Sequence, residues 1–511
     1  MRIKRFLAAV LCCCGMMTAS AQTAEDTVYV FRADQPYGTY FLPAPPDTAS
    51  LAYIDDLVQF QWGKTQRNTP RGDQASEESL WEEAIMRTVI AEVLELDTIN
   101  DETAPAITHL LSKAYDTGNQ STASTKEDYM RIRPFVQMND PLWAKWDDDY
   151  LRTNSSYPSG HTGFGWETTL IFAEMWPELQ DTLLRRGFQF GESRIITGAH
   201  YQSDVTAGYL CASASVAHAH TNPELQKDIA AARAEYARIK GLPDGYDPVA
   251  KAGLPLGEKI LNDPVDTTSY RYIGDLMLYW DAKRLRDTPR GQQAIDESEA
   301  SMSKLYQIFG EAMGITLNNE TTPAISKVMI AVLQATAEAA NHLKSVRFRK
   351  RPYVQLNDKT AIPEDEDIER DQSSFPSGGA CLGWSLALAM VQVAPECQNE
   401  ILRRGYDYGY NRLIVGYHWA TDIDASRQLS AAVLARLNAE PTFRDLVQQA
   451  RDEYLHLTTA IDLPSNTQHP SPITDSGEGR GGSLYDLQGR SLTSNPPQGL
   501  YISNGHVVAV K

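Results

Sequence analysis

Two long stretches of this 511-residue chain match each other at a nearly constant offset. Thr69-Pro70-Arg71-Gly72 recurs 219 residues later as Thr288-Pro289-Arg290-Gly291. From Pro105 onward the offset is 218, so that Leu184-Arg185-Arg186-Gly187 matches Leu402-Arg403-Arg404-Gly405. A register held over almost two hundred residues indicates a duplicated domain. It excludes a solenoid, whose repeats are far shorter.

The self-match divides the chain into parts of different character. We expect a signal peptide over 1–21, a first repeat over 22–242, a second repeat over 243–462, a flexible linker over 463–482 and a β-rich tail over 483–511. Turn residues mark the join between the repeats. The linker is rich in Ser, Pro, Gly and Thr, and the tail alternates short β-prone segments with glycines.

Both repeats have the apolar spacing of helices. Apolar residues three and four positions apart run through 77–94 and 225–240, and alternating runs typical of strands are missing. The predicted fold class is therefore all-α: two tandem helical domains followed by a small β-rich tail.

The N-terminus has the pattern of an export signal. Three cations in the first five residues precede an apolar stretch over 6–17, and Ala19-Ser20-Ala21 supplies the small residues of a cleavage site. The cysteines at 12–14 leave a lipoprotein as an alternative, without the small residue that a lipobox places before its cysteine. We predict an exported protein whose mature chain starts at Gln22.

Charge and cysteine content restrict the partners. Asp and Glu number 66 against 47 Lys and Arg, a formal net charge of −19, and no polybasic stripe interrupts this balance. Nucleic acid and anionic membrane surfaces are therefore poor partners. After the signal, no apolar run is long enough for a membrane span. Three cysteines remain, Cys211, Cys381 and Cys397, and an odd number favours buried thiols over a disulfide framework.

Three short segments of the first repeat carry residues with chemical potential. They are Lys126 followed after six residues by Arg133-Pro134, then Pro158-Ser159-Gly160-His161, and then Ser193-Arg194 with His200 and Asp204. Together they fix eleven positions in order. At roughly one in twenty for each position, a chance occurrence is untenable.

These residue types suit a phosphate group. Lys126, Arg133 and Arg194 are three cations that could converge on one anion, and the arginines supply forked donors. Ser159-Gly160 precedes an apolar helical segment, which places backbone N–H groups at a helix N-terminus.

His200 and Asp204 have the spacing of a nucleophile and its orienting carboxylate. At i and i+4 they share one face if helical, and the carboxylate could hold one imidazole nitrogen while the other attacks. A single histidine is more often a packing residue, and Arg–Asp pairs are usually solvated ion pairs. The joint pattern of the three segments favours a functional site.

The three segments resemble the signature motifs of the type 2 phosphatidic acid phosphatase superfamily. That superfamily includes bacterial class A non-specific acid phosphatases, membrane lipid phosphatases and vanadium haloperoxidases. The first repeat is most similar to the class A acid phosphatases, including in Asn68-Thr69-Pro70-Arg71-Gly72 and in Gly198-Ala199-His200-Tyr201-Gln202-Ser203-Asp204. The resemblance covers essentially all of the first repeat and the second repeat more loosely.

The resemblance implies a mechanism. His200 would form a phosphohistidine and be oriented by Asp204, while His161 would protonate the leaving oxygen and then activate water. The residues implied to hold the phosphoryl oxygens are Lys126, Arg133, Ser159, Gly160 and Arg194. These cations would act in place of a metal pair, so no metal and no cofactor are expected. Substrates would be small phosphomonoesters, and because class A relatives are expected to dimerise, the two repeats would pair within one chain.

The second repeat keeps most of the pattern but not the acid. The residues it retains are Lys344, Arg351, Ser377, Gly378, Arg412, His418 and Asp422. Gly379 stands where the acid histidine would be, and Asn411 replaces the motif serine. The prediction is a degenerate copy. A phosphate-binding or altered site is the alternative.

Other readings of the whole chain remain open. A vanadate-dependent haloperoxidase and a non-enzymatic phosphoester-binding protein are the alternative functions. Leu484–Arg490 with Gly499–Ile502 resembles the C-terminal sorting tail of type IX secretion cargo, which implies the secretion machinery as a partner and a cell-surface or extracellular location in place of the periplasm. An ordinary small β appendage is the alternative.

Overall fold

The computed structural model describes residues 27–80, 83–144, 149–299 and 301–459, together with four strands between 484 and 510. The expected signal peptide over 1–21 and linker over 463–482 lie outside the described residues. The chain forms two compact units, Met1–Ala460 and Ile461–Lys511.

Helices make up the first repeat. They are α1 (Gly38–Phe41), α2 (Leu51–Gln66), α3 (Pro70–Glu77), α4 (Glu83–Leu94), α5 (Pro105–Ser121), α6 (Ala123–Asp128), α7 (Pro134–Gln137), α8 (Asp149–Thr153), α9 (Gly160–Met175), the 3₁₀ turn η2 (Pro177–Leu179), α10 (Gln180–Thr197), α11 (Gln202–Ala219) and α12 (Pro223–Ile239). The helix expected over 77–94 is α4, which begins only at Glu83 because α3 ends at Glu77.

The second repeat follows the same order. Its helices are α13 (Pro248–Lys251), α14 (Tyr272–Lys283), α15 (Pro289–Asp296), α16 (Met302–Met313), α17 (Pro323–Val346), α18 (Pro352–Leu356), η3 (Pro363–Asp365), α19 (Glu366–Glu369), α20 (Gly378–Val393), η4 (Pro395–Cys397), α21 (Gln398–Val415), α22 (Ala420–Ala439) and α23 (Pro441–Thr459). From α14 onward these helices correspond to α2–α12, except that α17 runs through the positions of both α5 and α6. The all-α prediction is confirmed for the described part of the repeats.

One buried helix lies at the centre of each repeat, fully buried in the first and largely buried in the second. Every residue of α9 is buried, and α9 contacts α5, α10 and α11. Its counterpart α20 contacts α17, α21 and α22 in the same way. Because other helices pack around nearly all of their side chains, α9 and α20 fix the positions of the helices around them.

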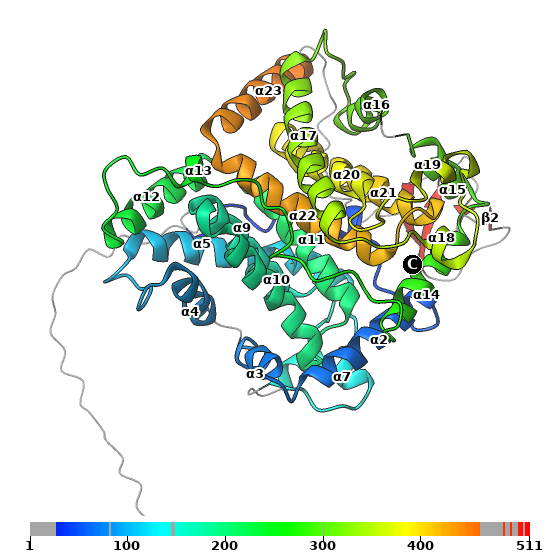
Figure 1. The fold of residues 1–511 in the computed structure, drawn as a ribbon, viewed down its shortest axis with the longest axis horizontal. Helices are drawn as coiled ribbons and strands as arrows, with labels where there is room; N and C mark the ends of the chain where they lie inside the picture. The colour runs from blue at the N-terminus through cyan, green and yellow to red at the C-terminus, as the bar shows by residue number, and fades with distance from the viewer. Residues whose placement is uncertain are drawn as a thin grey trace, which may run out of the picture. The chain divides into compact units, whose positions relative to one another are not determined.

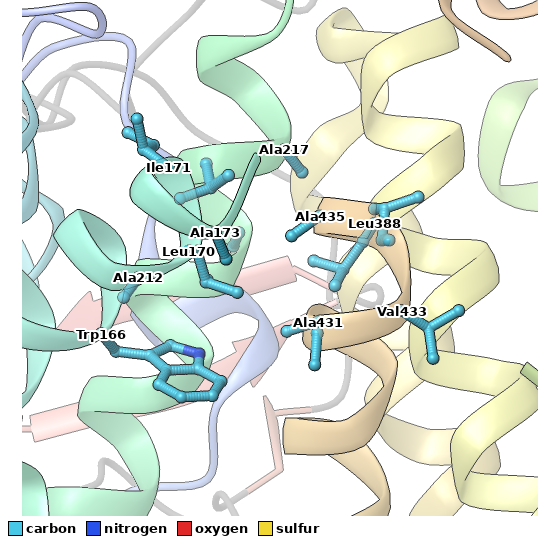
Figure 2. Close-up of a cluster of buried hydrophobic side chains, with 14 of the residues drawn as sticks. Trp166, Leu170, Ile171, Ala173, Ala212, Ala217, Leu388, Ala431, Val433 and Ala435 are labelled. Carbon is cyan, nitrogen blue, oxygen red and sulfur yellow. The ribbon is translucent and has the colours of Figure 1, made fainter. Parts of the chain in front are cut away.

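The two repeats share one hydrophobic core. Helix α9 contacts α22, α11 contacts α20, and α2 contacts α14 (Figure 1). Figure 2 shows Trp166 and Leu170 of α9 in the same cluster as Ala431 and Ala435 of α22. Small alanine side chains allow the helices to approach closely, and the cluster is continuous across the join.

Equivalent residues of the repeats meet at this interface. Thr206 Oγ1 donates a hydrogen bond of 3.3 Å to Asp424 Oδ2, and these residues are 218 positions apart. Asp55 lies against its own counterpart, Gly274, where an added Cβ would be 2.0 Å from Asp55 Oδ1. Contacts between equivalent positions are those that a two-fold axis produces.

The second unit contains a small antiparallel sheet. Its strands are β1 (Leu484–Tyr485), β2 (Ser491–Leu492), β3 (Gly499–Ser503) and β4 (His506–Val510), in the order β2-β1-β3-β4. In the described part of the chain, no helix is long and apolar enough to cross a membrane. Cys211 and Cys381 are buried free thiols, and Cys397 is a partly buried one.

The contact of Asp55 with Gly274 can be tested by stability. We expect Gly274→Asp to lower the free energy of unfolding by about 2 kcal/mol or more, because two carboxylates would then meet in a buried interface. Gly253→Asp is the matched control, since a Cβ there meets no atom within 4 Å. Equal thermal unfolding midpoints for the two variants would contradict this packing.

Candidate active site

The three sequence segments meet around the N-terminus of α9. The Ser159 N–H donates to the backbone oxygen of Asp204 at 2.9 Å, which joins the start of α9 to the start of α11. Lys126 Nζ donates to the carbonyl oxygen of Pro158, and the His200 N–H donates to the carbonyl oxygen of Arg194 at 3.2 Å. The predicted site residues of the first repeat therefore come together.

His200 lies in the short connection between α10 and α11. Gly198 ends α10 with φ +79°, a left-handed conformation that favours glycine, and turns the chain toward His200. His200 Nε2 is 2.8 Å from Arg133 Nη1, and Nδ1 is 3.5 Å from Asp204 Oδ2. The expected pairing is present, but the shared helical face is wrong: α11 begins at Gln202, so His200 precedes the helix while Asp204 is in its first turn.

A network of buried hydrogen bonds holds Asp204. Its Oδ2 accepts from the Tyr201 N–H at 2.8 Å and from Ser156 Oγ, and its Oδ1 accepts from Arg131 Nη1. The other nitrogen of Arg131 donates to Asp56 Oδ2 at 2.6 Å. Burial raises the pKa of Asp204, but Arg131 and His200 lower it by more, so that it lies well below its usual range.

Sequence reasoning missed these supporting residues. Arg131, Asp56 and Ser156 belong to none of the three segments. The signal that could have found them is the self-match, because Arg349, Asp275 and Ser374 occupy the corresponding positions. In the second repeat, Arg349 bridges Asp422 and Asp275 at 2.6 and 2.5 Å in the same way.

Three cations lie around His200: Arg133 and Arg194 are buried and Lys126 is partly buried. Burial lowers the pKa of Lys126 well below its usual value, the pKa of Arg133 to about 10 and that of Arg194 to about 9. Lys126 and Arg133 use part of their donors on backbone carbonyls, among them Ser155. Arg194 is only 1% exposed, and its Nε and Nη1 have no partner among the described residues. Unsatisfied buried donors of a cation indicate a place for an anion.

His161 is buried beside these cations. Its Nε2 lies 3.1 Å from the carbonyl oxygen of Leu80 and 3.2 Å from that of Ser79. Burial lowers its pKa well below the usual value, and the charges of Arg194 and His200 lower it further. The imidazole of His161 is therefore close enough to Arg194 and His200 for their charges to act on it.

In the second repeat, His418 has the counterparts of the neighbours of His200 but contacts them differently. His418 Nε2 is 3.2 Å from Arg351 Nη1, but its Nδ1 is 3.9 Å from Asp422 Oδ2 and only 2.7 Å from the backbone oxygen of Ser374. Burial and then Arg351 lower the pKa of His418 to about 3. Lys344 donates to the carbonyl oxygen of Ser373, as Lys126 does to that of Ser155.

An arginine occupies the place of the missing acid. Arg412 Nη1 donates to the carbonyl oxygen of Ser298 at 2.6 Å, and Ser298 is the counterpart of Ser79, whose carbonyl meets His161. A Cβ at Gly379 would be 2.5 Å from Arg412 Nε. The guanidinium therefore lies where the imidazole would be.

We call Lys126, Arg133 and Arg194 the anion cage of the first repeat, and their counterparts Lys344, Arg351 and Arg412 the cage of the second. A carboxylate also pairs with the second-repeat cage. Glu369 Oε2 accepts from Arg351 Nη2, so this ion pair meets part of the charge that an oxyanion would otherwise meet. The corresponding donor of Arg133 reaches only the neutral oxygens of Asn154 and Ser155. The two sites therefore differ at this arginine: a carboxylate of the chain pairs with Arg351, whereas Arg133 has no ion-pair partner among the described side chains.

No group of three or more His, Cys, Asp or Glu side chains is arranged to hold a metal ion in the part of the chain that the structure describes.

Comparison with known proteins identifies the family. The family model described as PAP2 superfamily matches residues 108–226. A non-specific acid phosphatase of Providencia stuartii is 38% identical over 219 residues, which is 43% of this chain and 88% of that protein. A non-specific acid phosphatase of Salmonella typhimurium is 36% identical over 210 residues, covering 40% and 80%. An acid phosphatase of Zymomonas mobilis is 29% identical over 250 residues, covering 47% and 92%.

The chain belongs to the PAP2 superfamily. The resemblance drawn from the three sequence segments is thereby confirmed. The matched PAP2 range contains all the predicted site residues of the first repeat, namely Lys126, Arg133, Ser159, Gly160, His161, Arg194, His200 and Asp204. Asp56, which supports Arg131 from α2, lies outside it.

The support network can be tested with a matched pair of variants. We expect Asp56→Asn to lower kcat by about 10–100-fold, because Arg131 loses one of the two carboxylates that hold it against Asp204. Asp275→Asn removes the equivalent contact in the second repeat and should leave kcat unchanged. Steady-state kinetics on one phosphomonoester give the measurement, with unfolding midpoints to show equal folding. Equal kcat values for the two variants would refute the role of Asp56 in holding Arg131 against Asp204.

Proposed function

We propose that the first repeat is an acid phosphatase that hydrolyses small phosphomonoesters through a phosphohistidine. The observation that carries the proposal is Arg194, a buried arginine with two unpartnered donor nitrogens. It lies beside Arg133 and His200, so a phosphate there would meet two forked donors and one nucleophile. The names of the relatives as acid phosphatases agree with this chemistry.

The hydrogen bonds favour one tautomer of His200. An arginine has donors and no acceptor, so Nε2 accepts from Arg133 and the ring proton sits on Nδ1, toward Asp204. The lone pair of Nε2 then points at Arg133, and it becomes free to attack when Arg133 donates to the phosphoryl oxygens instead. In the proposed step, Nε2 forms a bond to phosphorus while the bond from phosphorus to the ester oxygen breaks.

His161 handles the proton in both half-reactions. It gives a proton to the departing oxygen, and it then takes one from the water that attacks the phosphohistidine, which releases phosphate and regenerates His200. The pKa of His161 is lowered by burial and by Arg194. The negative charge of a bound ester offsets these cations and favours the protonated ring.

The second repeat has a different role in this proposal. Arg412 lies across Gly379, and Glu369 pairs with Arg351, so the chain's own groups engage two of the three cage cations. Without an acid, an alkoxide would have to leave unprotonated, which costs about 10²–10⁴-fold in rate. We therefore assign catalysis to the first repeat and a structural role to the second.

The arrangement of the chain is part of the proposal. We infer a tandem duplication whose copies pair as an intrachain pseudo-dimer, which the contacts of Thr206 with Asp424 and of Asp55 with Gly274 support. We also propose that the protein is exported, to the periplasm or, if the tail is a sorting signal, to the cell surface or medium. The observations behind export are sequence patterns only.

Paired histidine variants test which repeat is catalytic. We expect His200→Ala to lower phosphate release by roughly 10³-fold or more, since the nucleophile and acid act as one unit. His418→Ala should leave the rate at the wild-type level. Alkyl and aryl phosphates should both be assayed, because an aryl group leaves more easily without an acid.

Three further results would contradict the assignment. They are alkyl phosphate turnover by His200→Ala near the wild-type rate, loss of activity with a chelator, and halide oxidation in the presence of vanadate. The last would instead favour a haloperoxidase.

The pH profile tests the roles of the two histidines. The lowered pKa of His200 keeps its ring neutral, and able to attack, in mildly acidic solution. His161 must be protonated to act as the acid, and its protonated fraction falls as the pH rises. Because its pKa is lowered, this fall occurs at a lower pH than for an ordinary histidine. We expect kcat to be highest in the acidic to neutral range and to decline above it. A kcat that still rises well above neutral pH would show that His161 is not the acid.

A further inference from the structure

Two cavities at the contact between the repeats are counterparts of each other. The first interface cavity has a volume of 730 Å³ and is lined by the strap at 42–47 and 50. The second interface cavity has a volume of 350 Å³ and is lined by the strap at 261–266 and 269. The two sets of strap positions correspond one for one at the offset of 219 found in the sequence. In each case the strap of one repeat covers helices of the other.

A side chain of the protein occupies the smaller cavity. The Arg271 guanidinium lies 4.2 Å from the centroid of the Trp62 ring, and its Nε donates to Gln59 Oε1 at 2.8 Å. Burial lowers the pKa of Arg271, while the charges of Glu192 and Asp55 act in the opposite direction. The second interface cavity is thus a guanidinium site made of an aromatic ring, an amide oxygen and carboxylates.

The strap over the smaller cavity is also hydrogen-bonded to its floor. Asn262 Nδ2 donates to Glu192 Oε1 at 2.9 Å, and Arg185 Nη1 donates to Asn262 Oδ1 at 2.9 Å. The counterpart of Asn262 in the first interface cavity is Pro43, whose side chain cannot make such bonds. The counterpart of Arg185 is Arg403, which turns to Asp407 at 3.0 Å.

The larger cavity lacks the internal guanidinium. The position of Arg271 is taken by Ala52, which is too short to reach into the space that an arginine would fill. Trp62 and Glu192 are replaced by Asp281 and Tyr410. The wall therefore again combines an aromatic ring with a carboxylate. The ring now comes from α21 and the carboxylate from α14, whereas in the second interface cavity the ring comes from α2 and the carboxylate from α10.

The wall of the larger cavity carries more acidic than basic side chains. Its charged residues are Asp47, Asp55, Asp56, Asp281, Asp407, Asp424, Arg290, Arg403 and Arg427. The three arginines pair with carboxylates of the wall itself: Arg290 and Arg403 with Asp407, and Arg427 with Asp424.

Two of its carboxylates remain without a basic partner. Asp47 and Asp55 form no ion pair with any described residue; Asp55, which lines both cavities, accepts a hydrogen bond from Gln59 Nε2 at 3.0 Å. Burial raises the pKa of Asp55 to about 8, and Asp56, Asp275 and Asp424 add to the shift. A cation beside Asp55 would favour its ionised form.

We propose that the first interface cavity binds an organic cation of the guanidinium class that carries an apolar body. The charged group would lie beside Asp55, in the space left open because Ala52 stands where the second repeat has Arg271; Asp281, which pairs with Arg284, also lines the cavity. The apolar body would contact the tyrosines and aliphatic side chains of the wall, including Tyr406, Leu413 and Ile423. The site is separate from the anion cage around His200 and takes a ligand of opposite charge.

Phenylguanidine is the probe, and isothermal titration of the full-length protein gives the stoichiometry. The wild-type protein should bind one equivalent. Ala52→Arg supplies the missing internal guanidinium and should abolish binding. Arg271→Ala empties the second interface cavity and should raise the stoichiometry to two. Neither variant alters the proposed catalytic residues, so phosphate release should remain at the wild-type rate in both.

The two variants make the proposal falsifiable independently of each other. An unchanged affinity in a folded Ala52→Arg protein would overturn it, and so would a stoichiometry of one or less for Arg271→Ala. If Ala52→Arg has a lowered unfolding midpoint, the Arg271→Ala titration decides alone. Saturating inorganic phosphate should not displace the probe. Displacement would place the probe in the anion cage and refute the interface site.

Discussion

The burial of three cations around one point is the constraint on which the catalytic half of the molecule depends. Lys126, Arg133 and Arg194 all have lowered pKa values because they are removed from water, and like charges lie close together. Such a cluster is unfavourable in an empty apolar interior. The fold tolerates it by giving the cations backbone carbonyls and two carboxylates, Asp204 near Lys126 and Arg133 and Glu78 near Arg194. The remaining unsatisfied donors are then directed at a ligand, which is how electrostatic binding of a phosphoryl group arises.

The second repeat shows the other solution to the same constraint. The chain engages the terminal nitrogens of its arginines, through Glu369 on Arg351 and through backbone carbonyls on Arg412, and leaves Nε of each without a partner among the described residues. These partners stabilise the cations and leave fewer donor nitrogens for an incoming anion. The absence of an acid at Gly379 and the contacts of Arg412 with backbone carbonyls go together, because the guanidinium occupies the space that a histidine side chain would need.

Much of the site could be predicted from sequence because its residues are fixed by chemistry at short spacing. His200, Arg133 and Lys126 follow from the types of groups that bind and attack phosphate. Arg131 and Asp56 could not be found in this way, because an arginine between two carboxylates is a common surface pattern and only tertiary structure buries it. The same holds for the i and i+4 interpretation of His200 and Asp204. The spacing was informative, but a tight turn at Gly198 produces the contact instead of a helical face.

The helical fold class could be predicted from the spacing of apolar residues. The differences between the two repeats at their contact could not. Within a pair related by a two-fold axis, a residue near the axis meets its own copy, so a carboxylate there would face a second carboxylate. A duplicated chain can change the two copies separately. Asp55 meets Gly274, and Asp424 meets Thr206, so each buried carboxylate faces a small or hydroxyl-bearing partner. The same freedom allows Arg271 to fill one interface cavity while Ala52 leaves the other open, which a symmetric dimer of identical subunits could not achieve.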